Sequence, residues 1–148
     1  IHIFSEKHEN YYLTSWKMFI KNPITGIGPN NFRIECKKTE YESELDPCST
    51  HPHNNYFQLL AELGAIGLIL IFIIIYYFSK TILNQIYARL ANKNFLSDYQ
   101  ICLFACILCS VWPFLPTMNL FNNWINIIYF LPIGFLLHTI YGKDNRTE

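Results

Sequence analysis

The chain divides into a polar first part and a second part with long uncharged segments. Charged side chains recur throughout residues 1–62, whereas residues 63–79 have none and residues 99–142 form a run of 44 without Asp, Glu, Lys or Arg. Uncharged apolar runs of about 18 residues or more are typical of helices that cross a membrane. We therefore predict an all-α integral membrane protein whose polar segment precedes its membrane-spanning helices.

Three membrane-spanning helices follow from the lengths of these segments. The first predicted span covers residues 63–78, and its helix is expected to begin near Pro52 because the apolar spacing of a helix starts before the span. The 44-residue run is too long for one crossing and fits two helices, predicted at 99–116 and 124–141. A polar turn at 117–123 separates these two helices.

The Lys and Arg residues predict which side of the membrane each segment faces. The connector 79–98 and the tail 142–148 together carry five positive and three negative side chains, against six positive and eight negative in residues 1–62. The positive-inside rule, which counts Lys and Arg in short loops, places the connector and the tail in the cytoplasm. Residues 1–62 and the turn 117–123 are then extracytoplasmic.

Composition excludes some classes of protein. The 148 residues are 51% apolar, 17% aromatic and only 15% charged, with a formal net charge of zero. Such a chain is too poor in charge and too aromatic for a disordered tail. It also lacks the basic run expected of a nucleic-acid-binding surface, so no nucleic acid partner is predicted.

The start of the chain has no targeting pattern. Residue 1 is Ile, and no basic stretch with a cleavage site precedes the first polar segment. Because the first span begins only after residue 62, we expect the chain to be the C-terminal piece of a longer membrane protein. A short open reading frame with an unusual start is the alternative.

A glycine-containing loop is expected after a surface helix that runs from Ser5 to about Lys21. The loop, residues 24–33, reads ITGIGPNNFR, and Gly26 and Gly28 allow backbone turns that other residues disfavour. Backbone N–H groups exposed there, with Arg33 behind them, could hold a phosphate. An ordinary turn is the alternative interpretation.

Two of the five cysteines bracket a charged stretch of the polar segment. Cys36 and Cys48 flank residues 37–47, and in an oxidising compartment such a pair suggests a disulfide. Two free thiols are the alternative. Cys102, Cys106 and Cys109 instead lie at helical spacing in an apolar run and are expected to act as small packing residues.

The sequence Ser-Thr-His-Pro-His-Asn-Asn at residues 49–55 is the strongest candidate for chemistry. Pro52 suits the first turn of a helix, which would place His53 beside unpaired N–H groups that can hold an anion such as a pyrophosphate. The same field lowers the pKa of His53, and a neutral imidazole can accept a proton from a hydroxyl. A bound anion would raise that pKa, and a surface loop with merely hydrogen-bonded histidines is the alternative.

A zinc site is a weaker explanation of the same residues. Cys36, Cys48, His51 and His53 are spaced as C-x11-C-x2-H-x-H, which matches no common zinc pattern. No metal site is predicted.

The histidine lies in a pattern that resembles a known family. His53-Asn54, nine residues and then Gly64-Ala65-Ile66-Gly67 resemble the His-Asn-x9-Gly-x-x-Gly signature of the bacterial O-antigen ligase family. Further residues share the resemblance: Trp16, Asn22-Pro23-Ile24-Thr25-Gly26-Ile27-Gly28, Phe32, Leu59 and Glu62. The predicted spans and the short tail also look like the C-terminal end of that family.

The resemblance implies a polytopic glycosyltransferase of the bacterial inner membrane, of the GT-C class with about a dozen helices, of which this chain would be a C-terminal portion. Such enzymes transfer a glycan from undecaprenyl pyrophosphate to an acceptor on the periplasmic face, without a metal or other cofactor. In ligases the acceptor is lipid A–core, in related polymerases another lipid-linked repeat, and in related oligosaccharyltransferases a protein hydroxyl. Membrane lipids are the remaining expected partners.

The resemblance also suggests roles for single residues. His53 matches the essential histidine of the family and would act as a base on the acceptor hydroxyl or orient it. The residues expected to bind substrate are Gly26, Gly28, Asn31, Arg33 and Asn54. Two departures stand out, because the other functional arginines of the family lie mostly upstream, in segments that this sequence does not contain, and the two bracketing cysteines are not part of the signature.

A small three-span membrane protein without catalytic activity is the alternative from another class. It predicts that the natural gene begins near residue 1 and that His53 tolerates substitution.

Overall fold

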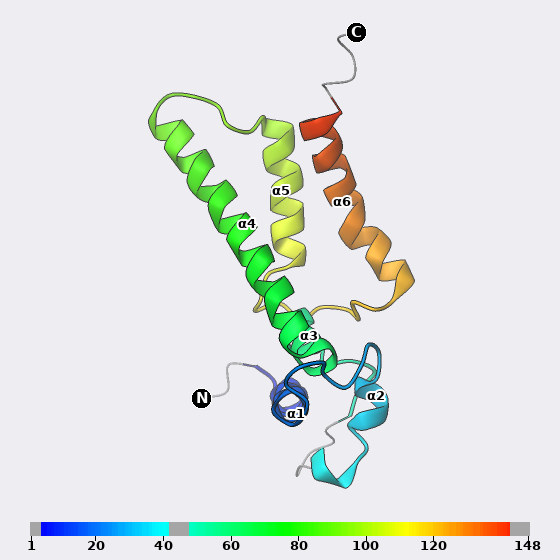
Figure 1. Cartoon of the computed structure of the whole chain (residues 1–148). Helices are drawn as coiled ribbons and strands as arrows, with labels where there is room; N and C mark the ends of the chain where they lie inside the picture. Colours follow the sequence, from blue (N-terminus) through cyan, green and yellow to red (C-terminus); the bar gives the residue numbers. More distant parts are fainter. Residues whose placement is uncertain (1–3, 42–47, 143–148) are drawn as a thin grey trace. The chain divides into compact units, whose positions relative to one another are not determined.

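The computed structural model describes residues 4–41 and 48–142, and within them every regular element is a helix (Figure 1). The elements in chain order are α1 (Glu6–Lys21), α2 (Phe32–Glu35), the short 3₁₀ helix η1 (Thr39–Tyr41), α3 (Asn55–Leu63), α4 (Ala65–Leu90), α5 (Asp98–Ser110) and α6 (Asn123–Tyr141). The chain forms two compact units. The first contains Ile1–Ile73 with Pro113–Asn122, and the second contains Ile74–Trp112 with Asn123–Glu148.

The first unit is built on the contact between α1 and α3, which lie side by side in Figure 1. Its core consists of five buried side chains: Met18, Phe32, Cys36, Tyr41 and Ala61. Burial of such apolar surface is the main favourable term in folding. This unit contains all of the residues predicted to form the site.

The glycine-containing loop caps the C-terminal end of α3. The last carbonyl groups of a helix have no partner within the helix, and here the N–H of Ile27 donates to Ala61 O and the N–H of Gly28 to Glu62 O, both at 3.0 Å. Gly26 has a φ of +66°, and a Cβ there would lie 2.6 Å from the Glu62 carbonyl oxygen. The loop therefore needs glycine for both its conformation and its close approach to α3.

Replacing Gly26 by alanine should lower the free energy of unfolding by about 2–4 kcal/mol, because the methyl group meets backbone atoms and the φ is positive. Gly134→Ala is the matched control, since a Cβ at Gly134 meets nothing within 4 Å. It should leave the stability unchanged or raise it slightly. Denaturant unfolding of both variants in detergent tests this prediction, and equal stabilities would contradict it.

The helix predicted to run from Pro52 to residue 78 has different bounds. Asn54 caps the helix, so α3 begins at Asn55, and Gly64, with a φ of +58°, ends it before α4 starts. α4 then continues past residue 78 to Leu90, because residues 79–90 contain neither glycine nor proline. The helix thus begins close to the predicted start near Pro52, but Gly64 divides it and its second part runs beyond residue 78, while the bounds of the membrane span stay a prediction.

Within residues 4–41 and 48–142, two helices are long and apolar enough to cross a membrane: α4 with 26 residues and α6 with 19. α5 has 13 residues and ends at Ser110, six residues before the predicted end at 116, because the residues that precede Pro113 disfavour helical geometry. At about 1.5 Å per residue, α5 spans about 20 Å, less than a hydrocarbon core of about 30 Å. Two of the three predicted spans thus correspond to helices with the length and composition to cross a membrane. The third span and the sidedness of the segments stay predictions.

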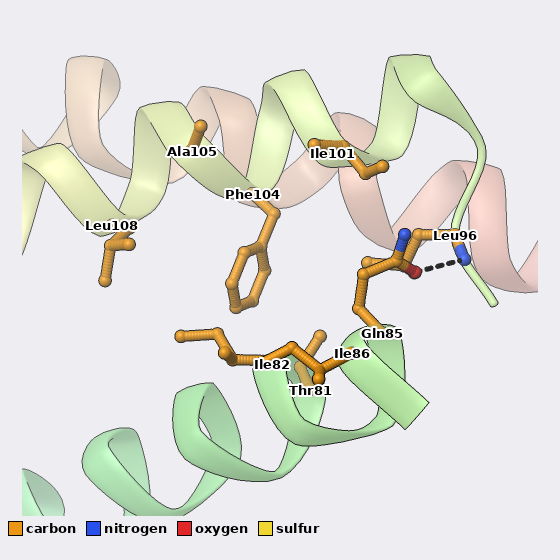
Figure 2. Close-up of a pocket in the computed structure, with 9 residues that line it drawn as sticks. All are labelled: Thr81, Ile82, Gln85, Ile86, Leu96, Ile101, Phe104, Ala105 and Leu108. Atoms are coloured by element: carbon orange, nitrogen blue, oxygen red, sulfur yellow. Dashed lines mark hydrogen bonds between the residues drawn. The ribbon is translucent and has the colours of Figure 1, made fainter. Parts of the chain in front are cut away.

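In the second unit, α5 packs against α6 through buried Phe104, Ile107 and Leu136. An apolar groove of about 210 Å³ runs between the second half of α4 and α5, and Figure 2 shows Ile82 and Phe104 facing each other across it. Gln85 lies at one end, where its Oε1 accepts from the N–H of Leu96 at 3.0 Å. The three cysteines of α5, expected to be packing residues, are exposed within the described structure: Cys102, Cys106 and Cys109.

Candidate functional site

His53 lies directly before the N-cap of α3. Its φ of +59° is uncommon for a residue other than glycine, and its side chain is half-buried. The Nε2 atom lies 3.0 Å from the Ser49 hydroxyl. The segment that precedes α3 therefore holds the imidazole in one orientation at the edge of the first unit.

Asn54, expected to bind substrate, is the helix cap. Its Oδ1 accepts from the N–H groups of Tyr56 and Phe57 at 2.9 and 3.3 Å, and its Nδ2 donates to Pro113 O at 2.8 Å. The side chain is only 3% exposed. The donors at the start of α3 that were expected to hold a pyrophosphate are therefore partly used by this cap, and His53 lies outside the first turn.

Aromatic rings and two further histidines surround His53. The ring of His51 is 4.2 Å away between centroids, and the rings of His8 and Tyr11 on α1 are 5.5 and 5.7 Å away. Burial lowers the pKa of His53 first, and positive charge on His51 or His8 lowers it further. The neutral imidazole expected from the sequence is thus favoured, with burial as the leading cause rather than the helix field.

His51 fixes a distant loop against the site. Its buried ring bonds through Nδ1 to the Thr50 hydroxyl at 2.9 Å and through Nε2 to Thr117 O at 3.1 Å. Because a carbonyl only accepts, Nε2 carries the proton. The N–H of Thr117 in turn donates to His53 O at 2.9 Å. The segment 113–122, predicted in part as a simple turn, therefore holds the backbone of His53 in place.

The burial of His51 predicts a loss of stability in acid. Burial lowers the pKa of His51 below its ordinary value of 6.5, although the bond to Thr117 O raises it in part. Its stabilising contribution is thus fully present above about pH 6.5 and is lost as the pH falls through the folded-state pKa. The free energy of unfolding, measured from about pH 8 to about pH 5, should fall less in His51→Gln than in the wild type, and parallel curves would contradict this.

Glu62 is the centre of a buried polar network. It is 1% exposed, and its carboxylate accepts from the N–H groups of Asn30 and Phe32, each at 2.9 Å. Gln58, one helical turn earlier, donates to Glu62 Oε2 at 3.2 Å and to Asn119 Oδ1 at 2.7 Å. The network joins the glycine-containing loop, α3 and the segment 113–122 within the first unit. Burial raises the pKa of Glu62, and these hydrogen bonds lower it in part.

The other residues expected to bind substrate lie near Glu62 rather than at the imidazole. The N–H groups of Gly26 and Gly28 donate to Asn22 O and Glu62 O, so a phosphate cradle at these donors does not fit the geometry and the alternative of a structural turn does. Asn31 Nδ2 donates to Ile27 O at 3.0 Å and closes the same turn. Arg33 is exposed on α2, and its positive charge contributes to lowering the pKa of Glu62.

Cys36 and Cys48 form a disulfide in the structure, with their Cα atoms 5.3 Å apart. The bond ties the end of α2 to the segment that carries His51 and His53. Most of the charged stretch between them, residues 42–47, lies outside the described residues. Within the described ranges, no group of three His, Cys, Asp or Glu side chains is arranged to hold a metal ion.

Several residues of the site were not expected from the sequence. His8 contacts His53 from α1, Thr117 bonds both His51 and His53, and Asn119 joins the network of Glu62. One usable signal was present, since Gln58 and Glu62 are polar residues one turn apart in an otherwise apolar helix. His8 and Thr117 carry no comparable local signal.

Comparisons with known proteins match the part of the chain that contains His53, Asn54 and Glu62. Residues 5–72 match the family model described as O-antigen ligase. A curated protein of Rickettsia conorii (strain ATCC VR-613 / Malish 7), named "Putative polysaccharide ligase", is 36% identical over 88 residues, which cover 56% of this chain and 20% of that protein. The chain thus spans about a fifth of that relative, and no solved structure matches it significantly.

Both matches support an O-antigen ligase-like family, so the resemblance predicted from the sequence is confirmed. The family match covers α1, the glycine-containing loop, α3 and the start of α4.

Proposed function

We propose that this chain is part of a membrane glycosyltransferase that transfers a glycan from undecaprenyl pyrophosphate to an acceptor hydroxyl on the periplasmic face, with O-antigen as the glycan and lipid A–core as the acceptor. The observation that carries the proposal is the half-buried imidazole of His53, whose pKa burial lowers, held within the segment that matches the family. The periplasmic placement of this segment, and an inner-membrane location, are parts of the same proposal.

To act as a base, His53 needs a ring nitrogen that can accept a proton. Its Nε2 faces Ser49, which leaves Nδ1 to accept the proton of the acceptor hydroxyl as the new glycosidic bond forms. The bond between the sugar carbon and the phosphate oxygen breaks, and undecaprenyl pyrophosphate leaves with the electron pair. No oxidation or reduction takes place, so the transfer needs no redox cofactor.

Charge on the leaving group has to be neutralised, and preorganised positive charge often contributes most to catalysis. Arg33 is the one residue of the predicted phosphate-binding set that offers a cationic side chain, and it is exposed on α2. Because Gly26 and Gly28 use their N–H groups within the fold, the proposal assigns this role to Arg33 and to residues of the longer enzyme.

Lipid analysis of cells that lack the full-length gene tests the proposal. Loss of capped lipopolysaccharide, with long chains accumulating on undecaprenyl pyrophosphate, would establish ligation of O-antigen. A shift to single-repeat chains would instead indicate a polymerase of the same family, and a changed glycoprotein profile would indicate transfer to protein hydroxyls. Unchanged lipids and glycoproteins would contradict glycan transfer and favour a membrane protein without catalytic activity.

A further inference from the structure

A second concave surface lies beside the histidine cluster in the first unit. It is an open groove of about 320 Å³ between α1 and α3, lined by Glu9, Tyr12, Leu13, Trp16 and Phe57. The groove combines three aromatic rings with one carboxylate. Ligand sites in proteins are typically concave and mostly apolar, with a few placed polar groups.

The aromatic wall of this groove is preorganised. The rings of Tyr12 and Phe57 are stacked, with centroids 4.5 Å apart and planes 5° from parallel. Trp16 is 46% exposed, although an indole buries a large apolar area when a partner is present. Two rings are thus fixed by their own contact, and the third offers an open face.

Tyr12 is the buried part of the groove wall. Its ring packs against those of Phe57 and His8, and its hydroxyl lies beside the Asn54 side chain, whose interaction lowers the pKa of Tyr12 in part while burial raises it. The exposed indole of Trp16 and the carboxylate of Glu9 are therefore the groups of the groove that a ligand would contact.

The groove is connected to the candidate catalytic residue through ring contacts. The ring of Tyr12 stacks on that of His8 at 6.3 Å, and His8 meets His53 edge to face at 5.5 Å. A sugar ring in the groove would therefore lie within a few side chains of the imidazole. This arrangement fits a glycan with one sugar residue at His53 and another in the groove.

We propose that the groove of Tyr12, Trp16 and Phe57, with the Glu9 carboxylate at its edge, binds a pyranose ring of a glycan substrate one or more residues away from the reacting sugar. This inference rests on the proposed function. The apolar C–H face of the sugar stacks on the exposed indole of Trp16, and its hydroxyl groups donate to the carboxylate of Glu9.

Binding of an oligosaccharide to the full-length protein in detergent tests the groove without any need for transfer. The probe is an oligosaccharide of one to three repeat units, released by mild acid from the surface polysaccharide of the host and observed by saturation-transfer NMR. Trp16→Ala should weaken binding about tenfold to a hundredfold, since stacking on an aromatic ring is worth a comparable amount elsewhere. Trp16→Phe keeps an aromatic face and should lose less.

Ile20→Ala is the matched control, because Ile20 is an exposed apolar residue of α1 outside the groove. It should bind the oligosaccharide as the wild type does. In a transfer assay, Trp16→Ala should raise KM about tenfold with kcat near the wild-type value. Unchanged binding in Trp16→Ala would overturn the proposal that the groove binds a sugar. Equal losses of binding in Ile20→Ala would also overturn it and would indicate a general apolar surface, such as one facing lipid.

The two proposals fail separately. If the wild type transfers no glycan but binds the oligosaccharide in a manner that depends on Trp16, the proposed sugar site is supported and the proposed transfer activity is wrong. If transfer requires His53 but Trp16→Ala changes neither binding nor KM, the proposed sugar site is wrong and the proposed transfer activity is supported.

Discussion

Replacing His53 by alanine should lower the rate of glycan transfer by ~10²–10⁴-fold, which is the usual contribution of a positioned acid–base group. The imidazole is held by Ser49 and by the backbone bond from Thr117, and its lowered pKa keeps it able to accept a proton. The measurement is the initial rate with purified full-length enzyme and lipid-linked donor. Complementation of cells that lack the gene provides the same test in the native membrane.

Stability separates a chemical effect from a folding effect. The His53 side chain is half-buried and has one direct hydrogen bond to a side chain, so His53→Ala should insert and unfold much like the wild type. His138→Ala is the matched control, because His138 is an exposed histidine of α6 in the second unit. Wild-type transfer in His53→Ala, or an equal loss in His138→Ala, would contradict the catalytic role.

The apolar helices are the part of the fold that the sequence predicts best. Residues 63–79 and 99–142 carry no charge, and α4 and α6 lie within or begin in these segments. The first and last residues of the helices were harder to predict, because they depend on single contacts. The Asn54 cap and the positive φ of Gly64 divide the predicted first helix, and hydrophobic pattern alone does not encode either feature.

The site could be predicted only where its signal is local. His53 and Asn54 stand next to each other in a pattern that the family comparison also covers, so the sequence singles them out, while their catalytic and binding roles stay predictions. The substrate-binding roles expected of Gly26 and Gly28 stay predictions, but their N–H groups donate within the fold, to Asn22 O and Glu62 O. Gly28 and Glu62 lie far apart along the chain, so no spacing in a sequence pattern shows their contact.

The same argument applies to the segment 113–122. Its Asn and Thr residues suggested an interfacial turn, and a turn alone would not need to contact the polar segment. In the structure, Thr117 bonds His51 and His53, and Asn119 bonds Gln58. These contacts join residues more than 60 positions apart. Polar residues near a membrane boundary can therefore form tertiary hydrogen bonds as readily as they face solvent.

Glu62→Ala should lower the free energy of unfolding by about 2–5 kcal/mol, because it leaves several buried donors without a partner. The N–H groups of Asn30 and Phe32 and the amide of Gln58 all donate to this carboxylate. Phe32 and Gln58 are fully buried, so their donors do not reach water easily, whereas the bond of Asn30 is partly buried. Transfer should fall as well, because the network supports the segment that holds His53.

Glu35→Ala removes the same charge from the same unit and is the matched control. Glu35 pairs with Lys38 at the surface, and exposed pairs contribute about 1 kcal/mol or less. Glu62→Gln keeps one accepting oxygen and should fall between the wild type and Glu62→Ala. Its curve should also lack the component by which ionisation of Glu62 lowers stability as the pH rises above about 4.5, since the folded-state pKa is raised. Denaturant unfolding across pH measures both effects, and a Glu62→Ala stability equal to that of Glu35→Ala would show that the network does not hold the unit together.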